Sequence, residues 1–262
     1  MQGDIQVEMR EVAGCGRVAF VTIANDRKLN TLNPALMQRF IEHCADLGQD
    51  AALRAVVLTG EGRRAFVGGA DIMAMAGLPD GEAARGFITL VHGCCRAVRD
   101  LPVPVIARIN GWTLGAGLEL AAACDLRIAV PEAKFGMPEV RVGIPSVVEA
   151  ALLPGLIGWG RTRRLLLLGE TIDAATAAAW GFLEEVVPAV ALDATVTTWL
   201  HHLGEAGPQA IRDQKALIRR WEDLPMQQAI AAGIDAFAAA WRTPEPRQML
   251  GAFAERQKQR KK

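Results

Sequence analysis

The fold of this chain is decided by residues 109–125, which read INGWTLGAGLELAAACD. A β-branched run at 105–109 leads into this stretch and predicts a buried strand. Glycines 111, 115 and 117 then interrupt the chain, and strong helix formers follow at 118–124, with Glu119 in the first turn. The pattern therefore predicts a strand, a glycine-rich break and a helix.

The start of this helix could hold a negatively charged oxygen. Backbone N–H groups at a helix start have no intrahelical partners, and the aligned peptide dipoles add positive charge there. Glu119 would lie beside whatever these groups hold, and the turn at 136–139 would bring a second carboxylate, Glu139, from a chain stiffened by proline. The alternative is structural, because acids in a first helical turn commonly complement the dipole at the surface. Spacing alone leaves both interpretations open.

Composition indicates a soluble, reduced, cytoplasmic protein. The 262 residues are 51% apolar, and 29 basic residues balance 29 acidic ones, so no global field attracts nucleic acid or a membrane surface. No signal peptide or membrane span is expected from the sequence. The four histidines are scattered and predict no metal site. An odd set of cysteines without C-x-x-C spacing favours free thiols: Cys15, Cys44, Cys94, Cys95 and Cys124.

The first half of the chain alternates strands and helices. Apolar runs predict strands at 17–23, 55–59, 103–109 and 126–130, and capped amphipathic patterns predict helices at 34–47 and 82–99. Residues 60–69, rich in glycine and arginine, are predicted as a loop. Strands that are apolar throughout and separated by helices predict a parallel α/β sheet with right-handed crossovers.

The second half is predominantly helical. The predicted elements are helices at 146–156, 162–168 and 173–180, a strand at 184–187, and helices at 191–205, 208–222, 226–241 and 246–257. We therefore divide the chain into an α/β core, residues 1–190, and a C-terminal helical region, residues 191–262.

Four motifs in this order closely resemble the enoyl-CoA hydratase (crotonase) family. They are Ala65–Ile72 (AFVGGADI), the glycine-rich segment 110–120, the segment 124–129 (CDLRIA) and the segment 135–139 (FGMPE). The resemblance covers nearly the whole chain from about Val18 onward. It implies a crotonase-like spiral of βαβ units, followed by an all-helical part through which copies assemble as a homotrimer or a homohexamer. It also implies an acyl-CoA substrate whose coenzyme A is part of that substrate, with no separate cofactor.

The resemblance assigns roles to four residues. The backbone N–H groups of Ala70 and Ala116 would form an oxyanion hole for the thioester oxygen, although many members carry glycine where Ala116 stands. Glu119 would orient and activate water, and Glu139 would protonate the α-carbon. Because isomerases of the family often keep only the acid matching Glu139, the presence of both acids favours a hydratase. An isomerase or another enolate-stabilising enzyme is the alternative, and a non-catalytic RNA-binding homologue is a third reading.

Substrate contacts are also implied by the resemblance. They are expected at Arg27, Lys28, Leu29, Gly69, Asp71, Ile72, Gly115, Pro138, Phe237 and Arg256. Met73 stands where a basic residue is common. The segment 144–153 (IPSVVEAALL) departs from the Ile-Pro-Gly-x-Gly-Gly-Thr-Gln-Arg-Leu of many hydratases. Glu149 in it could be a third acid or an ordinary helix-start glutamate, and the acyl group stays open.

Overall fold

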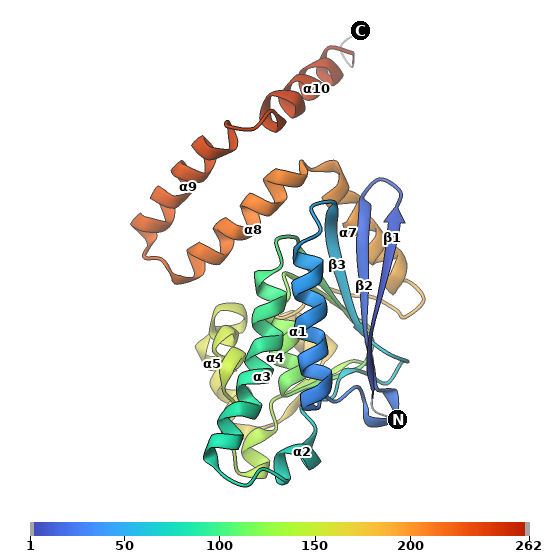
Figure 1. The fold of residues 1–262 in the computed structure, drawn as a ribbon, viewed down its shortest axis with the longest axis vertical. Helices are drawn as coiled ribbons and strands as arrows, with labels where there is room; N and C mark the ends of the chain where they lie inside the picture. The colour runs from blue at the N-terminus through green and yellow to red at the C-terminus, as the bar shows by residue number, and fades with distance from the viewer. Residues whose placement is uncertain (1–2, 260–262) are drawn as a thin grey trace.

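The computed structural model describes residues 3–259 and builds them around a six-stranded sheet (Figure 1). The strand order is β1-β2-β3-β5-β7-β10, with β1 antiparallel to β2 and all other neighbours parallel. The strands are β1 Asp4–Val12, β2 Gly16–Ala24, β3 Leu53–Gly60, β5 Val105–Ile109, β7 Leu126–Ala129 and β10 Glu185–Val186. The central strands are almost wholly buried, as expected for a parallel sheet covered on both faces.

A second sheet runs beside the first and gives the fold its spiral. Its order is β4-β6-β8-β9, from Ala65–Val67, Trp112–Leu114, Lys134–Gly136 and Thr171–Asp173. The turns that begin at β3, β5 and β7 each add one strand to the large sheet and one to the small sheet, as β5 and β6 do before helix α4. The expected crotonase-like α/β fold is confirmed.

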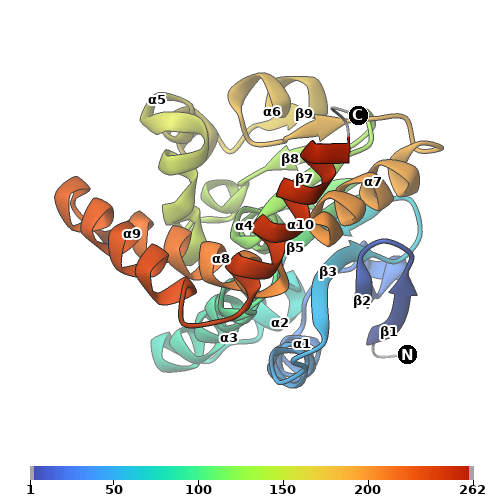
Figure 2. The same cartoon turned by 90° about the horizontal axis from the view of Figure 1, so that it is seen from above.

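The helices have the following bounds: α1 Pro34–Gly48, α2 Ile72–Ala76, α3 Gly81–Asp100, α4 Ala116–Ala123, α5 Leu153–Leu168, α6 Ala174–Trp180, α7 Leu192–Glu205, α8 Pro208–Asp223, α9 Met226–Ala240 and α10 Glu245–Gln259. Three 3₁₀ turns are η1 Asp26–Lys28, η2 Glu139–Val142 and η3 Val148–Leu152. Helices α1 and α3 cover one face of the large sheet and α7 covers the other (Figure 2). The cap predicted before α1 is confirmed, because the Asn33 side chain accepts from the Leu36 N–H.

Two sequence predictions are wrong in detail. The loop predicted over 60–69 contains strand β4 at Ala65–Val67. Strands of three residues offer too few alternations for periodicity to detect, and pairing with β6 defines this one. The helix predicted over 146–156 is instead η3 followed by α5, and Gly158 breaks α5 with a φ of 77°. Glycine adopts this left-handed conformation readily, so the chain turns there without strain.

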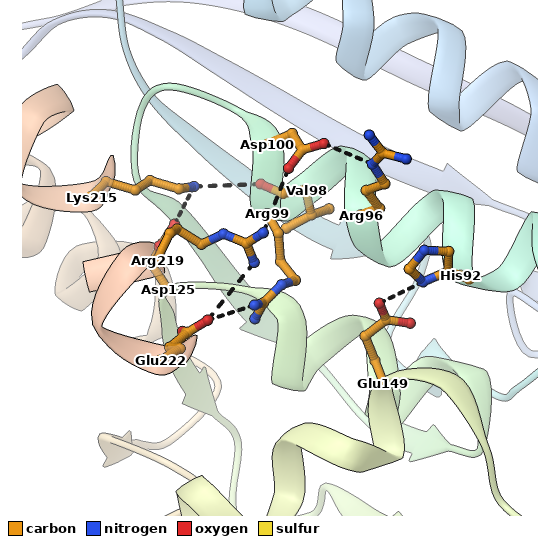
Figure 3. A network of polar contacts seen from close by, with 10 residues as sticks. All are labelled: His92, Arg96, Val98, Arg99, Asp100, Asp125, Glu149, Lys215, Arg219 and Glu222. Carbon is orange, nitrogen blue, oxygen red and sulfur yellow. Dashed lines mark hydrogen bonds and ion pairs between the residues drawn. The ribbon is translucent and has the colours of Figure 1, made fainter. Parts of the chain in front are cut away.

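Helix α8 is anchored to the core by a buried lysine. The Nζ of Lys215 donates to the carbonyl oxygen of Val103 at 2.9 Å. It also pairs with the Asp125 carboxylate at 2.7 Å (Figure 3). Lys215 is only 6% exposed, and a buried ammonium is tolerated when its donors find partners in this way.

Helices α9 and α10 project from the body of the molecule, with the C-terminal end far from the N-terminal end (Figure 1). They expose large apolar side chains: Met226, Ile230, Ile234, Phe237, Trp241, Met249, Leu250 and Phe253. Within residues 3–259, no helix combines the length and apolarity needed to cross a membrane. The division of the chain at residue 190 stays a prediction.

Candidate active site

The site is built where two neighbouring strands of the small sheet end. Strands β4 and β6 are parallel, so the loops that follow them emerge at the same edge. The two loops are in close contact, since a Cβ added at Gly117 would lie 2.0 Å from the carbonyl oxygen of Val67. Only glycine permits this approach. The glycine-rich break therefore sets the start of α4 directly against the loop that carries Ala70.

The N–H of Ala70 is directed away from the chain that supports it. Ala70 forms an isolated parallel bridge with Leu32, in which Leu32 N–H donates to Gly69 and Asp71 N–H donates to Leu32. Because successive peptide groups in an extended chain point to opposite sides, the Ala70 N–H points the other way. Among the described residues it has no acceptor.

The N–H of Ala116 is also unpaired. Ala116 is the first residue of α4, so its N–H has no intrahelical acceptor, and none is provided by the rest of the described chain. Gly115 holds the turn before it with a φ of 50° and donates its own N–H to Gly136 at 2.9 Å. The two donors that the resemblance predicts for an oxyanion hole are therefore both available at one edge of the small sheet.

The two predicted catalytic acids flank this turn. Glu119 lies in the first turn of α4 and is 3% exposed, so the alternative of a surface acid is wrong. Glu139 follows Pro138 at the start of η2, and a Cβ added at Gly115 would lie 2.5 Å from its Oε1. Gly115 is thus required because the Glu139 carboxylate occupies the space of a side chain.

Both acids are shifted toward the protonated form. Burial, and then the charge of Glu139, raises the pKa of Glu119 to about 8, against a smaller opposing hydrogen bond from the backbone of Ala150. Burial also raises the pKa of Glu139. Two carboxyl groups that repel each other in a poorly solvated place favour holding one proton between them. This is the condition for a site that accepts one proton and donates another.

A residue without a predicted role, Ser146, completes the position of Glu139. Its Oγ donates to Oε2 of Glu139 at 2.8 Å, and this bond lowers the pKa of Glu139 against the effect of burial. Ser146 stands where many hydratases carry glycine. A serine close after an acid is too common a pattern for sequence to single out.

Next to the Ala70 loop lies the turn formed by Arg27, Lys28 and Leu29. The Leu29 carbonyl accepts from the Gly68 N–H at 2.8 Å, and Lys28 pairs with Asp71 at 3.0 Å. Asp71 is 8% exposed and caps α2 by accepting from the backbone N–H groups of Met73 and Ala74. Its direct role in the structure is to hold the loop.

The buried Asn30 fixes the same turn, a structural role that the sequence pattern does not indicate. It accepts from the Asn25 N–H and donates to the carbonyl groups of Glu61 and Ala65. The side chain of Ile72 is 61% exposed, directly after this loop. These contacts bring the predicted residues at 27–29 and 69–72 together at one side of the site.

Phe237 and Arg256 are not brought to this place within one chain. Phe237 lies on α9 and is 70% exposed, and Arg256 lies on α10. Both helices extend away from the body that contains α4 (Figure 1). Their predicted contact with substrate stays a prediction.

Glu149 is buried, in contrast to an ordinary helix-start glutamate. It is 7% exposed at the start of η3, and its Oε1 lies 2.8 Å from Nδ1 of His92 on α3 (Figure 3). Among residues 3–259, this pair included, no three His, Cys, Asp or Glu side chains gather as metal ligands would. All five cysteines are buried free thiols.

Comparison with known proteins identifies the family. The family described as enoyl-CoA hydratase/isomerase matches residues 14–261. The short-chain-enoyl-CoA hydratase of Clostridium acetobutylicum is 34% identical over 244 residues, 93% of each chain. The crotonyl-CoA hydratase of Syntrophomonas wolfei is 33% identical over 243 residues, covering 92% of this chain and 93% of the relative.

Solved structures give the same result. The enoyl-CoA hydratase of Bacillus anthracis superposes with a TM-score of 0.89 at 31% identity, covering 96% of each chain. That of Mycobacterium smegmatis superposes with a TM-score of 0.91 at 27% identity, again over 96% of each chain. The relatives named hydratases are enzymes of the lyase class. With its family match across most of its length, this chain belongs to the enoyl-CoA hydratase/isomerase family.

Proposed function

We propose that the protein is an enoyl-CoA hydratase, which adds water reversibly across the C2=C3 bond of a 2-enoyl-CoA thioester. The observation that carries this proposal is the pair of acids, the buried Glu119 and the half-buried Glu139, beside the unpaired N–H groups of Ala70 and Ala116. Hydration requires a base for the water and an acid for the α-carbon, and the two carboxyl groups can supply both.

In the proposed reaction the thioester oxygen lies between the N–H groups of Ala70 and Ala116. As water adds at C3, negative charge moves onto this oxygen and forms an enolate, which the two donors stabilise more than they stabilise the ground state. Each donor of this kind contributes on the order of 100-fold or more in rate. The fixed backbone supplies these donors without reorganisation.

The two acids exchange protons with a single water molecule. Glu119 orients the water and takes its proton as the oxygen bonds to C3, and Glu139 delivers its own proton to C2. The pair begins and ends the cycle with one proton, so the reaction is balanced. The pKa of Glu119, about 8 without substrate, means that the proton must move to Glu139 when the thioester and water bind. The Ser146 hydroxyl can turn to accommodate either state of Glu139.

We further propose that the coenzyme A part lies over the turn at 27–29 and the loop at 69–72. Lys28 has a 60% exposed side chain although it pairs with Asp71, so its ammonium can also reach a phosphate. Met73 is 77% exposed where a basic residue is common, and Arg27 would have to replace that contact. No separate cofactor is needed, because the chemistry uses only carboxyl groups and backbone donors.

We propose that the protein works in the cytoplasm as a homotrimer or homohexamer. The apolar side chains that α9 and α10 expose would be costly in water and are typical of an interface between copies. In such an assembly Phe237 and Arg256 of one copy would approach the site of another. Light scattering on the purified protein tests this, and a monomer at micromolar concentration would contradict it.

The experiment for the activity is hydration of crotonyl-CoA, followed by loss of the absorbance of its conjugated thioester. We expect turnover by the wild-type protein and loss of about 1,000-fold or more in Glu139→Gln. Unchanged turnover in Glu139→Gln would exclude the assigned role. A panel of 3-enoyl-CoA substrates separates the isomerase alternative, which gains support only if one of them outperforms the 2-enoyl substrate.

A further inference from the structure

A further buried carboxylate, Glu149, has no part in the reaction proposed above. Its side chain is 9% exposed, and only one of its oxygens is paired, Oε1 with His92. Oε2 is buried and has no hydrogen-bond partner among the described residues. A buried unpaired carboxylate oxygen is unfavourable for folding. We therefore expect this oxygen to bind a ligand rather than to stabilise the chain.

The backbone that carries Glu149 is strained. Val148 adopts a φ of 38°, which is exceptional for a β-branched residue. Strain of this kind is concentrated at ligand sites, where the surrounding structure maintains it. Both the strained residue and the unpaired oxygen therefore occur at the start of η3.

Glu149 lies on a segment that packs against the reacting acids. Helix α4, which carries Glu119, packs against η3, which carries Glu149. Three residues before Glu149, Ser146 donates its hydrogen bond to Glu139. The charge of Glu149 also contributes to raising the pKa of Glu119. The segment 146–149 therefore contacts one acid directly and packs on the helix that carries the other.

On its outer side the pair of Glu149 and His92 borders a cavity of about 450 Å³. Its lining combines charged residues of both signs, among them His92, Arg96, Arg99, Asp100 and Arg219 (Figure 3), with the apolar Val148, Ala151 and Leu152. Oε2 of Glu149 is buried although the residue borders this cavity, so this oxygen does not face the solvent there. An acyl chain that extends past Glu119 toward η3 would bring a donor group to this oxygen.

We propose that Glu149, held by His92, is a specificity-determining residue that accepts a hydrogen bond from a donor group on the acyl chain. The inference rests on the proposed function, and it narrows the substrate to 2-enoyl thioesters whose acyl chain carries such a donor, for which a hydroxyl group is the simplest probe. A site that offers a buried acceptor discriminates strongly against an analogue that leaves this acceptor unpaired.

Matched pairs of thioesters test the proposal. The pairs are crotonyl-CoA with its 4-hydroxy analogue, 2-pentenoyl-CoA with its 5-hydroxy analogue and 2-hexenoyl-CoA with its 6-hydroxy analogue. For at least one pair we expect the hydroxylated member to have a kcat/KM about 10- to 100-fold higher, the range for a hydrogen bond to a charged group. The ratio of the two Kd values within each pair is measured by calorimetry, on the saturated analogues of the same thioesters.

Glu149→Leu should bring these ratios close to one and improve turnover of 2-hexenoyl-CoA. The variant is expected to fold, because replacing a poorly paired buried carboxylate by an apolar group of similar size is commonly neutral or stabilising. His92→Gln should lower the ratios less, since it releases only Oε1. Glu82→Leu is the matched control, because Glu82 lies on α3, as His92 does, and its side chain is 88% exposed. It should leave the ratios unchanged.

The proposal is overturned if no hydroxylated member is preferred in turnover or in binding, or if the preference survives in Glu149→Leu. Absence of turnover with every thioester would be a failure of the proposed hydratase activity instead. In that case the Kd ratios of the saturated analogues still decide the role of Glu149.

Discussion

Ser146 donates a hydrogen bond of 2.8 Å from its Oγ to Oε2 of Glu139, the acid that also fills the space beside Gly115. The Glu139 carboxylate is therefore fixed at one oxygen by a hydroxyl group and lies against backbone at the other. A general acid that must deliver a proton to one carbon benefits from such fixation, because small errors in position reduce the rate steeply.

Ser146→Ala should lower kcat about 10-fold with a small change in KM. Loss of a hydrogen bond to an ionised group costs roughly 1.5 to 3 kcal/mol. Because the bond lowers the pKa of Glu139, its removal should raise that pKa. Glu139 must be protonated to act as the acid, so the alkaline limb of the kcat/KM profile should move to higher pH. The profile is measured on crotonyl-CoA between about pH 5 and about pH 9. In a Glu139→Gln background the same change should add no further shift, and an additive effect would contradict a direct role.

Gly117→Ala should abolish most activity and lower the melting temperature. The added Cβ would lie 2.0 Å from the Val67 carbonyl oxygen, so the start of α4 must move away from the Ala70 loop, and a shift of about 1 Å at such a site can cost on the order of 100-fold. Gly86→Ala on α3 is the control, because nothing lies within 4 Å of its new Cβ. It should be neutral or slightly stabilising. Comparable losses in both variants would mean that the close contact is not what matters.

The sequence predicts the central part of the site well because that part depends on local backbone. The glycine-rich break, the first turn of α4 and the proline-stiffened turn before Glu139 are all readable from residues within a few positions of one another. The unpaired N–H of Ala116 follows from the same local geometry, whereas that of Ala70 depends on the bridge to Leu32 and is predicted only by the resemblance. For Ala116, Glu119 and Glu139 the resemblance to a known family and the physical argument lead to the same place.

The rest depends on contacts between distant segments, which spacing does not encode. The pairing of Glu149 with His92 joins positions 57 residues apart, and the strands of the small sheet are defined only by their neighbours. Strand β1 is an exception, because its sequence DIQVEMREV alternates polar and apolar residues from Asp4 to Arg10, a local pattern typical of a half-buried strand. The strands predicted above do not include it. Phe237 cannot be judged from one chain either, since a single chain gives it no contact with the site.

Glu119→Gln should stabilise the protein above about pH 5 while it removes activity. The pKa of Glu119 is raised from 4.5 to about 8, so between these values the folded chain retains a proton that the unfolded chain has lost. Wild-type stability must therefore fall as the pH rises through this window. A shift of this size corresponds to an upper limit of about 5 kcal/mol. The neutral amide of glutamine does not titrate, so the free energy of unfolding of Glu119→Gln should not fall in this way.

The measurement is the melting temperature of both proteins at about pH 5 and about pH 8.5, on either side of the window given by linkage. The difference between Glu119→Gln and wild type should be small at the lower pH and large at the higher one. Glu132→Gln, at an exposed position, should follow wild type. A constant difference at both pH values would show that Glu119 does not hold its proton in the folded state.

Ala116→Pro should remove one oxyanion donor and leave the helix intact. Proline is well tolerated at the first position of a helix, where the N–H has no intrahelical acceptor, and α1 and α8 both begin with proline in this chain. We expect kcat on crotonyl-CoA to fall on the order of 100-fold or more, with a much smaller change in the Kd for butanoyl-CoA, because the donor acts mainly on the charge that develops during reaction. Circular dichroism and the melting temperature report whether the fold is retained. A folded variant with nearly full kcat would mean that the Ala116 N–H does not hold the thioester oxygen. An equal loss of binding and of kcat would mean that the proline ring blocks the site instead.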